Sequence, residues 1–181
     1  MNLGLKQNPL LKFLTFSGLT YLLLYLFYQF IVRRQTYYDQ KFIGTIIYGS
    51  NFILEMLQYK TFLILQDRDF QVIGIDGTSG VWIGSNCNAI SLFILFSVFI
   101  IWYPGIQKAK LWFIPLGIIS IHILNIIRVI GLVLLAKYYP EYLNFNHTYT
   151  FTFIVYAYIF ILWVWWVNRF SAKKQPDYNE D

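Results

Sequence analysis

Long uncharged apolar runs recur along the chain and are separated by short segments that carry most of its charged residues. A helix needs about 20 apolar residues to cross the hydrocarbon core of a bilayer. Five runs of about this length predict membrane-spanning helices at residues 13–32, 42–59, 88–103, 111–138 and 149–167. The second run is the weakest, because Gly44, Asn51 and Glu55 interrupt it, and an interfacial helix is the alternative there. The first run is followed by Arg33 and Arg34 rather than by a small-residue cleavage site, which indicates a retained span.

The segment between the second and third runs has a different pattern. In FQVIGIDGTSGVWIG, apolar residues alternate with small or polar ones on both sides of Asp76-Gly77, a pair that favours a β-hairpin turn. At residues 60–86 this segment is too short to bury a core of its own, so we expect it to lie on the membrane surface. The polar sequence of residues 171–181 predicts a disordered cytoplasmic tail after one integral membrane domain of residues 1–170.

Composition and charge agree with a membrane protein. Of 181 residues, 57% are hydrophobic, 21% are aromatic and only 13% are charged, a balance too apolar for an ordinary soluble domain. The net charge of +5 forms no basic stripe interleaved with aromatic residues, so nucleic acid is not an expected partner.

The positive residues instead indicate an orientation, because cytoplasmic loops carry an excess of Lys and Arg. A cytoplasmic carboxyl terminus with an external amino terminus places eight positive residues inside against five outside, the eight being Arg33, Arg34, Lys41, Lys108, Lys110, Arg169, Lys173 and Lys174. The expected fold class is therefore an all-α polytopic membrane protein with about five transmembrane helices and a small extracytoplasmic β-hairpin.

Three residues with catalytic potential converge on the outer side in this topology. Cys87, the single cysteine, begins the third span, Arg128 lies in the fourth, and His147 immediately precedes the fifth. A thiol, an imidazole and a guanidinium are the nucleophile, base and oxyanion donor of a cysteine acyl-transfer site. The structural alternatives are Cys87 as an apolar filler and His147 as an interfacial residue. Arg128 would then pair with Glu55, because an unpaired cation inside an apolar helix costs on the order of 3 kcal/mol.

Helix geometry relates the polar residues of the fourth span. His122, Asn125 and Arg128 follow at intervals of three, so Asn125 adjoins Arg128 and is expected to orient its guanidinium, whereas His122 lies about 9 Å deeper. His147 is therefore preferred over His122 as the base for Cys87. Arg128 is about 15 Å below the outer end of the span, so either the span protrudes or a polar cavity opens. The His and Cys spacings fit no zinc site and no glycine-rich phosphate loop is present, so neither metal nor cofactor is expected.

In their order and placement these residues resemble the exosortase and archaeosortase family. The resemblance rests on Cys87 opening a span, Asn125-x-x-Arg128 inside the next and His147 just before the last, and it covers roughly residues 85–167. Size and aromatic richness are similar to the short F-type exosortases of Bacteroidetes. Many relatives have a glycine soon after the cysteine, where this chain has Asn88-Ala89, and another downstream of the histidine, where it has Thr-Tyr-Thr-Phe.

The resemblance implies a cysteine protease-transpeptidase, a hydrolase embedded in a bacterial inner membrane with its active site facing the periplasm. It implies that Cys87 is the nucleophile, His147 the general base and acid, and Arg128 the transition-state stabiliser. The implied partners, besides membrane lipid, are exported proteins that end in a sorting signal of short motif, transmembrane helix and basic cluster. Transfer to an amine and hydrolysis both stay open. The rival hypotheses are a non-catalytic assembly or interaction protein with a structural Arg128/Glu55 pair, and a membrane acyltransferase that uses His147 alone.

Overall fold

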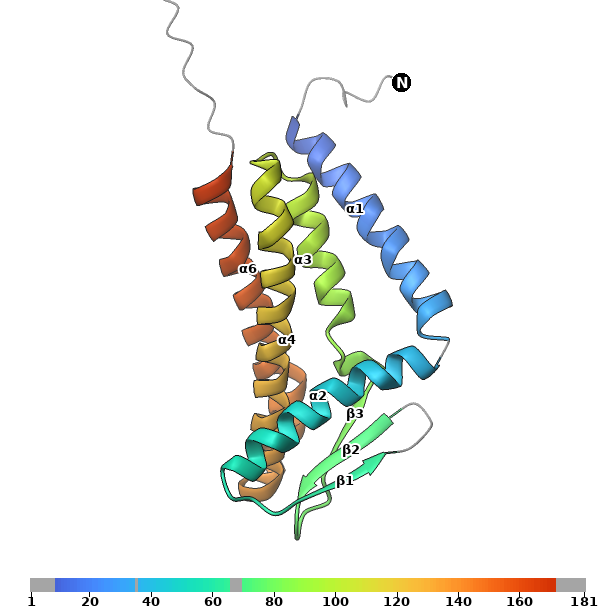
Figure 1. Ribbon diagram of the computed structural model, residues 1–181, viewed down its shortest axis with the longest axis vertical. Coiled ribbons are helices and arrows are strands. Elements are labelled where there is room, and N and C mark those ends of the chain that lie inside the picture. The colour runs from blue at the N-terminus through green and yellow to red at the C-terminus, as the bar shows by residue number, and fades with distance from the viewer. Residues whose placement is uncertain (1–8, 35, 66–69, 172–181) are drawn as a thin grey trace, which may run out of the picture.

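The computed structural model describes residues 9–34, 36–65 and 70–171, and it is mostly helical with one small sheet. Figure 1 shows a bundle of helices along the long axis of the molecule, with another helix lying across one end of the bundle above the sheet. In chain order the elements are α1 (Pro9–Phe27), the π-helical turn η1 (Tyr28–Val32), α2 (Thr36–Met56), β1 (Thr61–Leu65), β2 (Phe70–Ile75), β3 (Val81–Gly84), the 3₁₀ turn η2 (Ser85–Cys87), α3 (Ile90–Trp102), α4 (Gln107–Tyr138), the 3₁₀ turn η3 (Pro140–Tyr142), α5 (Leu143–Phe145), the π-helical turn η4 (Asn146–Thr150) and α6 (Phe151–Phe170). The predicted tail from residue 172 onward lies outside the described residues.

Among the residues that the structure describes, three helical runs are long and apolar enough to cross a membrane, namely Pro9–Val32, Gln107–Tyr138 and Pro140–Phe170. Within the last run, α6 alone has 20 residues, the length that a crossing requires. The third predicted span is the apolar helix α3, which has only 13 residues.

The prediction of a spanning helix at residues 42–59 needs correction. This run belongs to α2, which lies across the bundle rather than along it (Figure 1). Ile43, Ile46, Ile47 and Leu54 are buried and share a core with the sheet. The exposed residues of α2 are mixed, with polar ones such as Lys41 and Glu55 beside apolar ones such as Phe52 and Met56. A helix that crosses the bundle and packs one face on the sheet fits the interfacial alternative that the sequence left open.

The sheet has three antiparallel strands in the order β1-β2-β3. Pairing of Ile73 with Val81 across the turn confirms the predicted hairpin, and Gly77 (φ 84°) and Gly80 (φ 73°) supply the left-handed backbone that the turn needs. The strand β1, which pairs Thr61 with Ile75, was not predicted. Its sequence TFLIL is apolar almost throughout and lacks the alternation that marks a strand with one wet face.

Two hydrophobic cores lie along α4. The first joins the amino-terminal half of α4 to α3 and α6, through residues that include Phe96, Phe113 and Trp166. The second joins the carboxyl-terminal part of α4 to α2 and the sheet, with Val129 and Val133 among its members. A helix of 32 residues is about 48 Å long, against about 30 Å for a bilayer core. The fourth predicted span is therefore longer than a crossing along the membrane normal requires, and the sheet packs against its carboxyl-terminal part.

The two ends of the chain that the structure describes lie at the same end of the molecule (Figure 1). Near the start of α1, the ring of Phe13 contacts Tyr103 with centroids 5.5 Å apart. At the end of α6, the Phe170 carbonyl accepts a hydrogen bond from the backbone N–H of Ile106. Tyr103 and Ile106 both lie in the segment that connects α3 to α4. The described part of the chain therefore starts and ends at one end of the bundle, not at the opposite ends that five spans would give, because α2 does not carry the chain back along the bundle.

This arrangement also removes the predicted charge bias. Arg33 and Arg34 lie at the end of the molecule that holds Cys87, because Tyr28 in η1 accepts a hydrogen bond from Asn88. Among the described residues, the start of α1 and the end of α6 share their end of the molecule with Lys12, Lys108, Lys110 and Arg169, and the opposite end has Arg33, Arg34, Lys41, Lys60 and Lys137. Charge counting therefore does not determine the orientation.

Candidate functional site

Cys87 and His147 lie in contact at the junction of the helical bundle and the sheet. The Sγ atom of Cys87 is 3.5 Å from Nε2 of His147, and the thiol is only 7% exposed. Cys87 is the last residue of η2, the turn that links β3 to α3, while His147 lies on η4, just before α6. A π-helical turn rotates its side chains relative to a regular helix and is frequent at functional sites. The structure thus brings together the two residues that the sequence selected as nucleophile and base.

Arg128 lies on α4 close enough for its charge to act on His147. Burial lowers the pKa of His147 below its ordinary value, and the positive charge of Arg128 lowers the pKa further. The Nε of Arg128 is buried and has no hydrogen-bond partner. The Arg128 side chain lines a cavity of about 130 Å³ together with Ala89 and Thr152. Ala89 follows shortly after the turn that ends at Cys87. In the part of the chain that the structure describes, no carboxylate pairs with this guanidinium, which is therefore available to a developing negative charge.

The structural alternative for Arg128 does not form among the described residues. The carboxylate of Glu55 is exposed and accepts hydrogen bonds from Asn51, at 2.9 Å, and from Thr61, at 3.5 Å. The bond from Thr61 links the end of α2 to the start of β1. The expected Arg128/Glu55 pair is therefore wrong, because Glu55 bonds to Thr61 of β1 and not to a residue of α4.

Asn125 acts on a different partner from the one expected. Its Nδ2 donates a hydrogen bond of 2.7 Å to the backbone carbonyl of Cys87, and the side chain is 1% exposed. The expectation that Asn125 orients the guanidinium of Arg128 is therefore wrong, because the amide bonds to the backbone of Cys87 instead. Sharing a helix face made the two residues neighbours, but the amide points across to η2, where it holds the turn that carries the thiol.

His122, the less favoured histidine, lies in other surroundings. Its Nε2 is 3.4 Å from Oγ1 of Thr45, and its ring packs against Phe42 and Phe93. It therefore links α4 to α2 and α3, away from the contact between Cys87 and His147.

A buried polar cluster beside Cys87 was missed in the sequence. Asn88 donates hydrogen bonds to the hydroxyl of Tyr28 and to the carboxylate of Asp39, and Tyr28 donates to the same carboxylate at 2.8 Å. All three side chains are at most 5% exposed. The Oδ1 of Asn88 also accepts from the N–H of Ile90, in the first turn of α3. The residue after the thiol is thereby fixed to η1, to α2 and to α3 at once.

Ala89 adopts a left-handed backbone conformation (φ 63°) between η2 and α3. This conformation suits glycine and costs other residues about 1–2 kcal/mol. The chain has alanine in the region where relatives of the suggested family have glycine, and the hydrogen bonds of Asn88 hold the strained turn in place.

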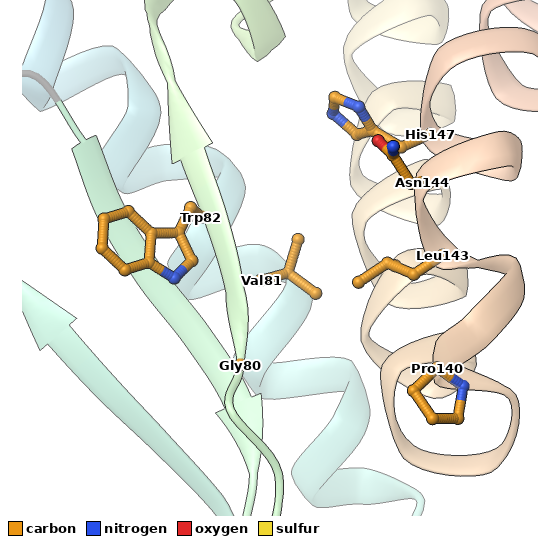
Figure 2. Close-up of a pocket in the computed structure, with 7 residues that line it drawn as sticks. All are labelled: Gly80, Val81, Trp82, Pro140, Leu143, Asn144 and His147. Carbon is orange, nitrogen blue, oxygen red and sulfur yellow. The ribbon is translucent and has the colours of Figure 1, made fainter.

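A groove of about 290 Å³ leads to His147 from the side of the sheet. Figure 2 shows its two facing walls, with Gly80, Val81 and Trp82 on β3 and its turn, and Leu143, Asn144 and His147 on the helical side. His147 thus lies both in the groove and in contact with the thiol.

Comparisons with known proteins add no chemistry to this arrangement. No family model, no curated protein and no solved structure matches the chain. In the part of the chain that the structure describes, no group of three His, Cys, Asp or Glu side chains is placed to hold a metal ion. The chemistry of the site therefore has to be argued from the geometry of Cys87, His147 and Arg128.

Proposed function

We propose that the protein is a membrane-embedded cysteine peptidase or transpeptidase of exosortase type, which cleaves the carboxyl-terminal sorting signals of exported proteins. The observation that carries this proposal is the 3.5 Å contact between Sγ of Cys87 and Nε2 of His147, made between residues 60 positions apart. A cysteine that only fills space has no need of a partly buried imidazole at its sulfur. The position of the pair, where an apolar bundle meets a sheet with a groove, suits a substrate that is part membrane helix and part extended chain.

The first step follows from the two side chains. Nε2 of His147 takes the thiol proton, and the sulfur of Cys87 attacks the carbonyl carbon of the scissile peptide bond. A tetrahedral intermediate forms with its charge on the former carbonyl oxygen. When it collapses, His147 gives its proton to the departing nitrogen, the C–N bond breaks, and a thioester stays on Cys87. The lowered pKa of His147 suits this role, because the imidazole is neutral and ready to accept a proton near pH 7.

Arg128 and Asn125 have supporting roles in this scheme. The unpartnered Nε of Arg128 supplies a donor for the oxyanion. Asn125 holds the backbone of Cys87 through its carbonyl and so positions the sulfur. In the second step, a water molecule or an amine attacks the thioester carbon, His147 accepts the proton of the attacking group, and the thiol is restored.

The proposed orientation has Cys87 on the extracytoplasmic side and both described chain ends on the cytoplasmic side. Two single-cysteine variants in a Cys87→Ala background test it, with Asp76→Cys in the hairpin turn and Lys108→Cys at the opposite end. A membrane-impermeant maleimide should label the first in intact cells and the second only after lysis. The reverse pattern would place the site in the cytoplasm and exclude exported substrates.

The activity itself is tested with a candidate substrate that ends in a motif, a helix and a basic cluster. Cys87→Ser, Cys87→Ala and His147→Ala should leave this substrate uncut, with losses of at least about 10²-fold. Arg128→Lys should also be impaired, because an ammonium lacks the planar fork of donors. The matched control is His122→Ala, which removes the other histidine and should retain cleavage.

The double variant Cys87→Ala with His147→Ala should be no worse than Cys87→Ala alone, because residues that act as one unit do not have additive effects. All variants need to reach the membrane in equal amounts. Cleavage by Cys87→Ala at the wild-type rate would end the cysteine-enzyme proposal and leave an assembly or interaction protein.

A further inference from the structure

The strand β3 is the edge strand of the sheet next to the candidate catalytic pair. It pairs with β2 on one side, through Val81 with Ile73 and Gly84 with Phe70, and the strand order β1-β2-β3 gives it no second strand partner in the described part of the chain. The backbone N–H and C=O groups on the outer side of an edge strand are a template for a further strand. Residues of β3 and its turn line one side of the groove, where Val81 points toward the helical wall (Figure 2).

The groove has the direction and walls that an extended chain needs. It lies between β3 and the segment from Pro140 to His147, and its helical wall ends at the imidazole that contacts Cys87. Val81 and Leu143 make its walls apolar, while the exposed amide of Asn144 is polar. Since His147 belongs both to the groove and to the candidate pair, whatever fills the groove is delivered to the sulfur.

We propose, building on the proposed function, that the substrate residues just before the scissile bond bind in this groove as an added β-strand, parallel to β3. Backbone hydrogen bonds to an edge strand bind a peptide regardless of much of its sequence, and pockets for alternate side chains select it. The apolar walls fit small uncharged side chains.

The parallel direction follows from where β3 leads. The strand runs from Val81 to Gly84, the chain then passes through Cys87, and α3 enters the bundle at Ile90. A peptide that follows β3 in the same direction reaches the sulfur with its carboxyl side pointing toward the bundle. A membrane helix that follows the cleavage motif then lies beside α3, α4 and α6. An antiparallel peptide would point that helix away from the bundle.

The test uses the full-length protein in lipid nanodiscs and two probes, acetyl-alanyl vinyl sulfone and acetyl-tetra-alanyl vinyl sulfone. The sulfur of Cys87 adds to the terminal vinyl carbon, and the carbon next to the sulfone takes up the proton, so no other reactant is needed. The two probes share one electrophile and differ only in chain length. We expect the longer probe to label Cys87 about tenfold faster, the gain expected from a small number of backbone hydrogen bonds.

Two changes should remove this gain, measured as the ratio of the labelling rates of the longer and the shorter probe. Asn144→Trp fills the groove from an exposed position, and the matched control Glu141→Trp changes an exposed neighbour outside the groove lining. In the longer probe, N-methylalanine at alternate positions should abolish the gain, because every second N–H of an added strand faces its partner. N-methylation at the positions between should leave the gain intact.

The outcomes separate this inference from the function on which it rests. If the short probe does not label wild-type Cys87, the nucleophile and the inference both fail. If the short probe labels but the longer one gains nothing, only the added strand is excluded. A gain that Asn144→Trp removes but N-methylation does not would mean that the groove binds apolar groups without strand pairing, as it would a lipid chain, and would overturn the proposal.

Discussion

The amide of Asn125, near the middle of α4, donates a 2.7 Å hydrogen bond to the backbone carbonyl of Cys87. The bond crosses from the longest helix to a three-residue turn, and both residues are buried. A buried carbonyl without a partner is costly, so the short turn gains a fixed place against α4. The position of the sulfur relative to His147 therefore depends on a residue that touches neither sulfur nor imidazole.

Asn125→Asp should destabilise the protein by on the order of 3 kcal/mol at neutral pH, because it replaces the donor with a buried carboxylate that faces a carbonyl oxygen. Thermal unfolding in detergent should show a clear loss that lessens at acidic pH, where a protonated carboxyl group donates again. Asn146→Asp is the matched control, since Asn146 also donates to a carbonyl, that of Tyr142, but in an exposed place. Equal losses of stability in the two variants would show that the buried Asn125 bond contributes no more to stability than the exposed Asn146 bond.

Tyr28→Phe tests the polar cluster next to Cys87. The change removes a donor to Asp39 and an acceptor for Asn88 in a site that excludes water, so we expect a loss of about 2 kcal/mol in the free energy of unfolding. Tyr149→Phe, at an exposed tyrosine, should change stability little. Because η1 and α2 would be released together, Tyr28→Phe should also increase hydrogen exchange at the amide of Ile90. Unchanged exchange there would mean that the cluster does not hold the start of α3.

Ala89→Gly should stabilise the protein by up to about 1 kcal/mol, because glycine adopts a positive φ without the steric cost of a Cβ atom. The same change at Ala157, in the regular helix α6, should lower stability by about 1 kcal/mol. Opposite shifts in the unfolding midpoint are therefore expected from two chemically identical substitutions. A loss at Ala89 as large as that at Ala157 would mean that the methyl group contributes more by packing than the backbone loses by strain.

Most of the architecture follows from local pattern, and the parts that do not are contacts between distant residues. Each apolar run overlaps one of the helices α1, α2, α3, α4 and α6. The pair Asp76-Gly77 located the hairpin. An apolar run alone does not say whether a helix enters a membrane or covers a sheet, which is why α2 was misplaced. The fold decides this through the strand β1 and the shared core beneath α2.

The candidate site shows the same division. The order of Cys87, Arg128 and His147 along the chain, combined with helix ends at one boundary, predicted which groups meet, whereas the roles of the supporting residues were hidden. Asn88 finds Asp39 49 positions away and Tyr28 60 positions away, and neither partner is marked by any periodicity. Helix geometry placed Asn125 beside Arg128 correctly as a neighbour, but it has no information on what lies across from the amide.

The last prediction concerns the electrostatic link between Arg128 and His147. Burial and the nearby guanidinium both lower the pKa of His147 from its ordinary value of 6.5. If the neutral imidazole accepts the thiol proton, alkylation of Cys87 by iodoacetamide should fall off only below pH 6.5, where His147 becomes protonated. In Arg128→Gln the contribution of burial stays and that of the positive charge is lost, so the pKa of His147 rises and the fall-off moves to higher pH.

Lys137→Gln is the matched control for this shift. It also removes one positive charge from α4, but Lys137 lies over the rings of Tyr59 and Tyr138 and is not among the groups that act on His147. Its alkylation profile should coincide with that of the wild type, whereas a His147→Ala profile should lack the imidazole step altogether. If Arg128→Gln left the midpoint in place, or moved it to lower pH, the charge of Arg128 would not reach the base, and its proposed role beside the Cys87–His147 pair would have to be abandoned.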